Sequence, residues 1–336
     1  GLSKPFVREC LLPEWWANDV EAEPDAVVTA AAYVSRRANL DFASLIQNDC
    51  QPHFKEALRS RYKVNAGGSD GQLALPQAIA SQVANLVAFA WSGSPYDPSK
   101  VVDPQAIRDH LLQRYPVVTL EGLTRYCLSC GIPVVHVSQF PEGQKKFDGM
   151  VGYFGDRSGT HHSKRPVIVI RKNHKSPAWL AFIVAHELGH IGHGHIQDVA
   201  IVDEQINPNK QSNDQEEVDA TEFGLEILFG KTNPCYYQLR HFKAEELAQY
   251  AKKKGQPDRI DPGSIILNYA WYKAEMDPNK RSKQICWATA QKALNYLAGE
   301  ADANAPKLIN GWLSPYLDRD RLSNDNQEFL ERMVDM

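Results

Sequence analysis

The chain has 336 residues, a formal net charge of -4 and 43% hydrophobic residues. A chain of this length can bury a large core, and one to three domains are expected. The weak negative charge argues mildly against a dedicated nucleic-acid-binding protein, because such proteins present basic surfaces. Six cysteines in so long a chain do not form the dense framework of a disulfide-stabilised secreted protein.

No segment of the sequence approaches the roughly 20 consecutive apolar residues of a membrane span. The N-terminal segment GLSKPFVREC lacks the apolar core of a signal peptide. Together with the scattered cysteines, these features lead us to expect a cytoplasmic protein that does not associate with a membrane.

The N-terminal part of the chain predicts helices. Asp25 can cap an alanine-rich helix over Ala26–Arg37, and a second apolar pattern covers residues 73–91. The stretches NAGGSDG at residues 65–71 and SGSPYDPSK at residues 92–100 are typical of loops. We expect a helical accessory domain over residues 1–91, a linker over 92–105, a core over 106–240 and a helical C-terminal region over 241–336.

After residue 105 the pattern becomes a mixture of helix and strand. A helix is expected over residues 119–130, ending at Gly131. Three short apolar runs predict strands over residues 133–137 (PVVHV), Gly149–Phe154 (GMVGYF) and residues 166–171 (PVIVIR).

The helix that begins at Pro177 should lie at the centre of the fold. Its first half, AWLAFIVA, is apolar on every side, which is typical of a buried helix. Later helices are expected over residues 216–229, 244–254, 264–273, 283–297 and 325–334. The expected fold class is α+β and mainly helical, with a small three-stranded sheet packed on the central helix and helical flanks.

The central helix ends in the sequence HELGH, His186 to His190. Two histidines four residues apart lie on one face of a helix, so both imidazoles can reach a single Zn²⁺. Glu187 follows the first histidine and is placed to take a proton from a water molecule that zinc activates. The motif therefore predicts one zinc ion per chain, with Glu187 as the general base.

A catalytic zinc ion needs a third protein ligand and one open coordination position. Glu217 is the best candidate, on the helix predicted to end at Gly230. It shares a helical face with the small residues Ala220, Thr221 and Gly224, which allow this helix to approach the motif helix closely.

Other polar residues could contribute to the site. Glu216 and Asp219 compete with Glu217 as third ligand, and Asp219 could instead orient a zinc-bound histidine. His193 could contact substrate, although the helix dipole explains a histidine at a helix C-terminus better. Candidates for stabilising a tetrahedral oxyanion are His161 with His162 and Tyr236 with Tyr237.

Two further motifs favour structural explanations. Cys127 and Cys130 form a CxxC, but no second such pair occurs, so packing is preferred to a zinc ribbon. Residues 244–271, with Gly255 near the turn, could form a helix-turn-helix. The lysines at 252–254 are typical of a solvated helix end, so DNA binding is the less favoured interpretation.

The order of strand, HELGH helix and ExxAxxF helix resembles the ImmA/IrrE family of metallopeptidases, which has a gluzincin-like core. The resemblance rests on residues 166–171, on the HELGH motif, and on Glu217, Ala220 and Phe223. Gly224 stands where the family usually has alanine. The resemblance implies His186, His190 and Glu217 as zinc ligands and Glu187 as general base.

The resemblance also implies a narrow protein substrate, such as a helix-turn-helix repressor cleaved in a stress, phage or mobile-element response. A substrate peptide would add to an exposed edge of the strand over residues 166–171. The alternative is a toxin-like or regulatory protein that binds an antitoxin-like regulator. Its zinc would then be structural or sensory, with a fourth ligand such as His193 or Asp219. A third interpretation is a metalloregulator with a DNA-binding flank.

Overall fold

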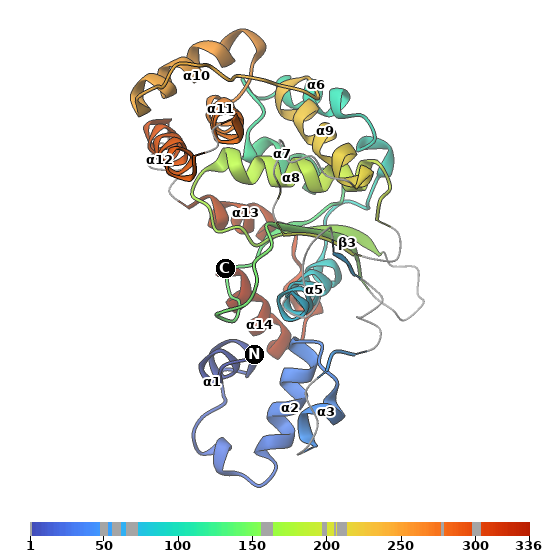
Figure 1. Ribbon diagram of the computed structural model, residues 1–336. Helices are drawn as coiled ribbons and strands as arrows, with labels where there is room; N and C mark the ends of the chain where they lie inside the picture. Colours follow the sequence, from blue (N-terminus) through green and yellow to red (C-terminus); the bar gives the residue numbers. More distant parts are fainter. Residues whose placement is uncertain are drawn as a thin grey trace.

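The computed structural model describes residues 2–47, 53–55, 62–64, 73–155, 164–196, 200–204, 206, 214–276, 279–297 and 304–336. Within these ranges the chain forms one five-stranded sheet with helices on both faces. Figure 1 shows the motif helix α8 and its neighbours above the sheet, and α5 and α14 below it. The α+β, mainly helical fold class predicted from the sequence is confirmed.

The strands follow the order β1-β5-β3-β4-β2 across the sheet. The strand β3 is antiparallel to its neighbours β4 and β5, whereas β1 runs parallel to β5 and β2 parallel to β4. The strands span β1 Tyr62–Val64, β2 Val134–His136, β3 Gly149–Phe154, β4 Arg165–Ile170 and β5 Ala200–Asp203.

The three predicted strands are β2, β3 and β4, and the expected number of strands was too small. The two additional strands, β1 and β5, have three and four residues. So short a strand contains too few residues to show the alternation of apolar and polar side chains that identifies a strand in a sequence. Only their pairing within the folded sheet reveals them.

The prediction that β4 is an edge strand was wrong. Its backbone is paired on both sides, with β2 along one side and β3 along the other. All six of its residues are buried, as is typical of a central strand covered on both faces. A substrate peptide therefore cannot add to β4. Edge strand β2 is covered too, because Asn310 accepts from the His136 N–H and donates to the His136 carbonyl, both at 2.8 Å.

The motif helix α8, Pro177–Gly192, is buried because other elements enclose it. It packs on β3 and β4 and lies against three helices of the same face of the sheet. Those helices are α7 Leu120–Ser129, α9 Gln215–Phe229 and α11 Pro262–Met276. Every residue from Leu180 to Ile191 is buried, which explains why the first half of the helix is apolar all round.

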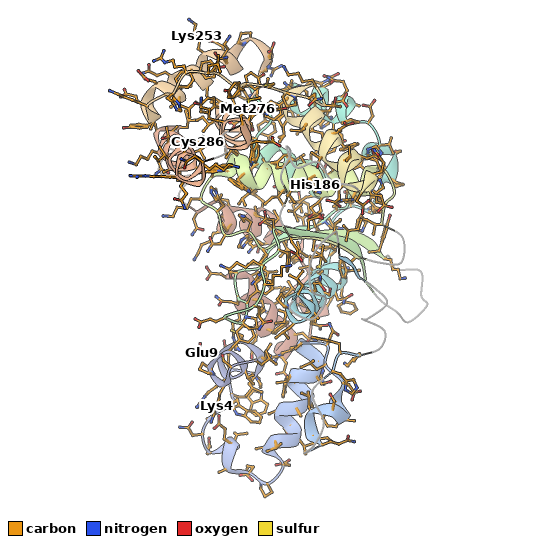
Figure 2. The ribbon with its side chains drawn as sticks, in the orientation of Figure 1. Lys4, Glu9, His186, Lys253, Met276 and Cys286 are labelled. Atoms are coloured by element: carbon orange, nitrogen blue, oxygen red, sulfur yellow. The ribbon has the colours of Figure 1, made fainter. Side chains whose placement is uncertain are left out.

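The second helix of the predicted helix-turn-helix, α11, is largely buried. The helix α10, Ala244–Asp258, continues through Gly255, and residues 263–271 of α11 are buried against their neighbours. A helix that reads DNA has to present a face to the major groove, so the buried α11 does not suit that role. The lysines at 252–254 are exposed, and Figure 2 shows Lys253 far from the buried His186.

The lower face of the sheet is covered by α5, Ala74–Ala90, and α14, Asn324–Val334, which pack on each other. Residues from both sides of the predicted boundary at 92 form one apolar core there, including Val83, Met150 and Phe329. The division into domains remains a prediction. The loop expected at residues 65–71 lies outside the described residues.

The remaining elements mostly agree with expectation. Asp25 precedes α2, although its side chain makes no capping hydrogen bond. Cys127 and Cys130 are buried in apolar surroundings. No helix among the described residues is both long and apolar enough to cross a bilayer. The other helices are α1 Lys4–Phe6, α2 Ala26–Arg37, α3 Phe42–Ile46, α6 Pro104–Leu112, α12 Lys280–Leu297 and α13 Ala305–Leu313. The short helical turns are Val7–Leu11, Val20–Ala22, Pro98–Lys100, Ser314–Tyr316 and Arg319–Arg321.

Candidate metal centre

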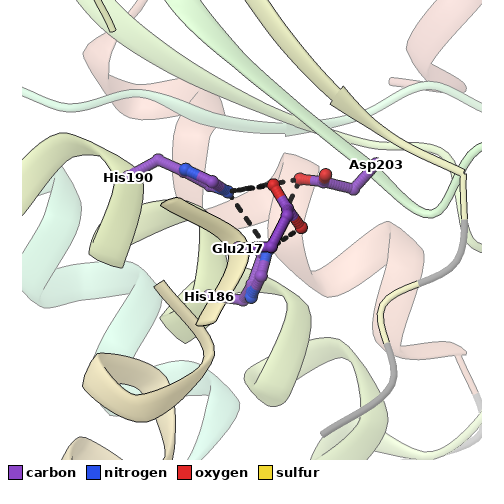
Figure 3. A group of neighbouring side chains, drawn as sticks. All are labelled: His186, His190, Asp203 and Glu217. Atoms are coloured by element: carbon purple, nitrogen blue, oxygen red, sulfur yellow. Dashed lines mark hydrogen bonds and ion pairs between the residues drawn. The ribbon is translucent and has the colours of Figure 1, made fainter. Parts of the chain in front are cut away.

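Four side chains from three elements meet on the α8 face of the sheet. His186 and His190 project from α8, Glu217 from the first turn of α9, and Asp203 from the end of β5 (Figure 3). One donor atom from each residue lies within 4.8 Å of all the others. Two imidazoles and two carboxylates form a donor set that suits Zn²⁺.

The spacing of these donors fits one tetrahedral ion. The two Nε2 atoms of His186 and His190 are 3.2 Å apart. The Glu217 carboxylate lies 3.5 and 3.3 Å from them, and Oδ2 of Asp203 lies 3.5 and 3.6 Å away. Ligands at about 2.0–2.2 Å from a tetrahedral zinc ion are about 3.3–3.6 Å apart. The two histidines are thus already arranged, relative to each other and to both carboxylates, at the separations that a bound ion requires.

The electrostatics of the site also favour a cation. Burial alone would lower the pKa of His186, but hydrogen bonds and charges from Asp203 and Glu217 raise it to about 9. The pKa of Glu217 is lowered, because the two histidines outweigh the effect of its burial. The carboxylates therefore stabilise positive charge at this point, and a metal ion can replace the proton that His186 would otherwise hold.

The second ring nitrogens of both histidines have partners that orient the rings. Nδ1 of His186 lies 3.2 Å from Oγ1 of Thr221. Nδ1 of His190 lies 3.0 Å from Nδ1 of His195, which follows α8. Such contacts direct Nε2 toward a metal ion. Asp219 was considered for this orienting role, but its carboxylate accepts a hydrogen bond of 2.7 Å from the Gln215 side chain. Thr221 is the residue of α9 that contacts His186.

Glu187 lies between the donor set and the sheet. A Cβ atom on Gly149 would be only 2.0 Å from Oε1 of Glu187, so only glycine in β3 leaves room for this carboxyl group. Among the described residues, no N–H or hydroxyl group donates to its buried oxygens. The Asp203 carboxyl lies close enough to share a hydrogen bond, and burial, followed by the charges of Asp203 and Glu217, raises the pKa of Glu187 well above its usual value.

Small residues bring α9 close enough to α8 for Glu217 to reach the histidines. A Cβ atom on Gly189 would be 2.7 Å from the carbonyl oxygen of Ala220, and one on Gly224 would be 3.1 Å from the backbone of Ala185. The small face of α9 that the sequence indicated is therefore the face that packs on the motif helix. Of the three carboxylates considered on α9, Glu217 alone belongs to the donor group; Glu216 and Asp219 do not.

The other predicted contact residues lie elsewhere. His193 caps the C-terminus of α8, is exposed, and stacks on His195 with ring centroids 5.3 Å apart. The Tyr236 N–H donates a hydrogen bond to the Asn268 side-chain oxygen, and Tyr237 lies beside Lys273, so both pack against α11. His161 and His162 lie outside the described residues.

Sequence reasoning missed Asp203 entirely. Its only signal is an acidic residue directly after the apolar triplet AIV, between the motif helix and the glutamate helix. So brief a pattern does not predict a strand. The neighbouring residues also give no sign that this strand ends beside His186 and His190. Thr221 was recognised only as a small residue, and His195 was not considered as an orienting residue.

A buried HExxH helix joined by a carboxylate from the next helix defines the class of HExxH metallopeptidases. Residues 135–253 match the family model of the IrrE N-terminal-like domain of the peptidase M78 family. The family resemblance that the motifs indicated is thus confirmed for residues 135–253, which match a domain of the ImmA/IrrE metallopeptidase family. No curated protein matches the chain.

Proposed function

We propose that this protein is a zinc-dependent endopeptidase that cleaves a specific protein partner in the cytoplasm. The observation that supports it most is the tetrahedral spacing of His186, His190 and Glu217 beside the buried carboxyl group of Glu187. A purely structural metal site does not need a carboxyl group that lies next to the metal and accepts no hydrogen bond from an N–H or hydroxyl group. A hydrolytic site requires one.

The residues divide the work of peptide hydrolysis. His186, His190 and Glu217 would hold the zinc ion, which when bound supplies a Lewis acid that polarises the scissile carbonyl and acidifies water. Glu187 takes a proton from the attacking water and delivers it to the leaving amine. Its raised pKa suits both halves of this task, because a carboxylate with an ordinary pKa would hold the proton too weakly.

The partner is proposed to be a helix-turn-helix repressor or an antitoxin-like regulator, cleaved during a stress, phage or mobile-element response. The large helical flanks support a selective enzyme, since α10, α12 and α1 to α3 lie outside the layers that build the metal centre. Such flanks offer surface for recognising a folded partner. The free cysteines among the described residues support a reducing compartment.

The test uses the zinc-loaded protein and the repressor encoded by a neighbouring gene. Wild-type protein is expected to cut the repressor at one position, identified by mass spectrometry, and Glu187→Gln is expected to leave it intact. Both proteins should contain one zinc ion per chain. A repressor that stays intact with both zinc-loaded proteins would remove the peptidase proposal.

A second candidate function has one observation in its favour. Asp203 supplies a fourth protein donor, and four protein donors are typical of structural zinc sites. The protein would then bind an antitoxin-like regulator without cutting it. A stable, zinc-dependent complex on size-exclusion chromatography, with both chains intact by mass spectrometry, would favour this function over proteolysis.

A further inference from the structure

Asp203 forms one corner of the group of four metal-binding side chains, and this corner is the one nearest the sheet. The other three donors come from the helices α8 and α9, whereas Asp203 approaches from the sheet (Figure 3). Its Oδ2 atom lies at nearly equal distances, 3.5 and 3.6 Å, from the two histidine Nε2 atoms. These are the separations expected of a ligand that shares one tetrahedral ion with them.

This corner faces the general base. Glu187 rests against Gly149 of β3, and Gly149 is the residue paired with Asp203 across the sheet. In a catalytic zinc site the position nearest the base belongs to the attacking water. In this protein the carboxyl group of Asp203 stands there instead.

The position of Asp203 is set by the backbone and not by a mobile side chain. Its carbonyl accepts a hydrogen bond of 2.7 Å from the Asp148 N–H. The preceding residue, Val202, is paired with β3 on one side and with Val64 of β1 on the other. The Asp203 side chain is only 2% exposed, so it is not a surface carboxylate that happens to point inward.

We propose that Asp203 is a fourth zinc ligand that closes the metal site in the resting protein. The peptidase becomes active when the Asp203 carboxylate leaves this position and one water molecule enters, so that the number of ligands is unchanged. The activation step rests on the proposed peptidase function, whereas the assignment of Asp203 as a ligand does not. The protein is thus a latent enzyme, and binding of its protein substrate would switch it on by shifting β5.

The test replaces zinc with Co²⁺ in the full-length protein and follows the visible spectrum during titration with azide. Azide can bind only where a coordination position is open. Wild-type protein is expected to keep its spectrum, whereas Asp203→Asn is expected to bind azide and to lose at least tenfold in cobalt affinity. Asp219→Asn is the matched control, since it removes a carboxylate of α9 outside the donor group and should behave as wild type.

A measurement on the wild-type protein alone tests the proposal even if the Asp203→Asn variant does not fold. Water-proton relaxation of the cobalt-loaded wild type is expected to show no exchangeable water on the metal. An exchangeable water, or azide binding by wild type as readily as by Asp203→Asn, would overturn the proposal. These readouts do not depend on cleavage, so a protein that cuts no substrate can still show Asp203 on the metal. A protein that binds no metal would overturn both proposals.

Discussion

The carboxyl group of Glu187 is both buried and close to other carboxyl groups. It is fully buried between α8 and the sheet, and it lies beside two further acidic residues, Asp203 and Glu217. Both conditions favour its protonated form and raise its pKa. A general base in such surroundings is a stronger proton acceptor than an exposed glutamate, which is the property that peptide hydrolysis requires.

Glu187→Gln is expected to lower the cleavage rate by about a hundredfold or more, because amide oxygen cannot accept and return the proton. Zinc content should stay at one per chain, since Glu187 is not among the four donors. Single-turnover cleavage and metal analysis measure the two effects. Loss of zinc together with activity would show that Glu187 helps to hold the metal.

Glu217→Gln tests the third ligand. We expect zinc affinity to fall at least tenfold, because the amide is a much weaker ligand for zinc and one negative charge leaves the site. Asp219→Asn, two residues further along α9, loses the same charge and should keep wild-type affinity. Competition with a chromophoric chelator gives both constants. Equal losses in the two variants would mean that overall charge, and not ligation, governs affinity.

His136 predicts an acid-sensitive step in stability. Burial lowers the pKa of this β2 histidine from 6.5 to about 4, although its hydrogen bond to the Lys172 carbonyl opposes the shift. The unfolded chain therefore binds a proton that the folded chain rejects, and stability falls as the pH drops from 6.5 toward 4. The linked loss is about 3 kcal/mol. Urea unfolding of zinc-free protein should show a flatter pH profile for His136→Gln than for wild type; parallel profiles would contradict this.

At the scale of elements, the contact between α8 and α9 decides whether the metal site exists. Gly189 of α8 lies against the backbone of Ala220, one turn from the carboxylate that completes the donor set. A larger residue on either helix would separate them. Gly189 of the HELGH motif thus allows α9 to pack closely on α8, and this packing brings Glu217 within reach of the metal.

Gly189→Ala is expected to destabilise the protein by about 1–3 kcal/mol and to weaken zinc binding, since α9 must move away. The matched control is Gly311→Ala in α13, where a Cβ would meet nothing within 4 Å. There the better helix propensity of alanine should add up to about 1 kcal/mol. Denaturant unfolding with zinc titration measures both. A stabilised Gly189→Ala protein with unchanged zinc affinity would refute the close packing.

At the scale of the whole molecule, the metal centre connects two helices, α8 and α9, to strand β5 of the sheet. Its donors come from α8, β5 and α9, which are separated by residues 193–199 and 204–214. The same sheet supports α5 and α14 on its other face. A bound ion therefore cross-links α8 and α9 to the sheet that also supports α5 and α14.

Removing zinc should lower the thermal unfolding midpoint of the whole chain, not only loosen the site. Binding to the folded state alone adds about 2.7 kcal/mol when free zinc is a hundred times its dissociation constant. Differential scanning calorimetry with and without chelator measures this shift, and Glu217→Gln should show a smaller one. An unchanged midpoint in wild type would mean that the ion does not link these elements.

Prediction from the sequence succeeded where an element carries its own signal. The helix α8 and the strand β3 are long or apolar enough to be recognised, and β3 was predicted with its observed bounds. The edge position assigned to β4 was wrong, because an apolar run shows that a strand is buried but not which strands flank it. The strand β5 gave almost no local signal and so its aspartate was overlooked.

The sequence alone determined the local chemistry: His186, Glu187 and His190 are held together by the period of one helix, whatever surrounds it. The small face of α9 also indicated Glu217. Only the tertiary structure decided that Asp203 joins them, because its position depends on the pairing of β5 with β3 and β1. Contacts between distant segments arise from the packing of the whole chain, and no spacing within the sequence encodes them directly.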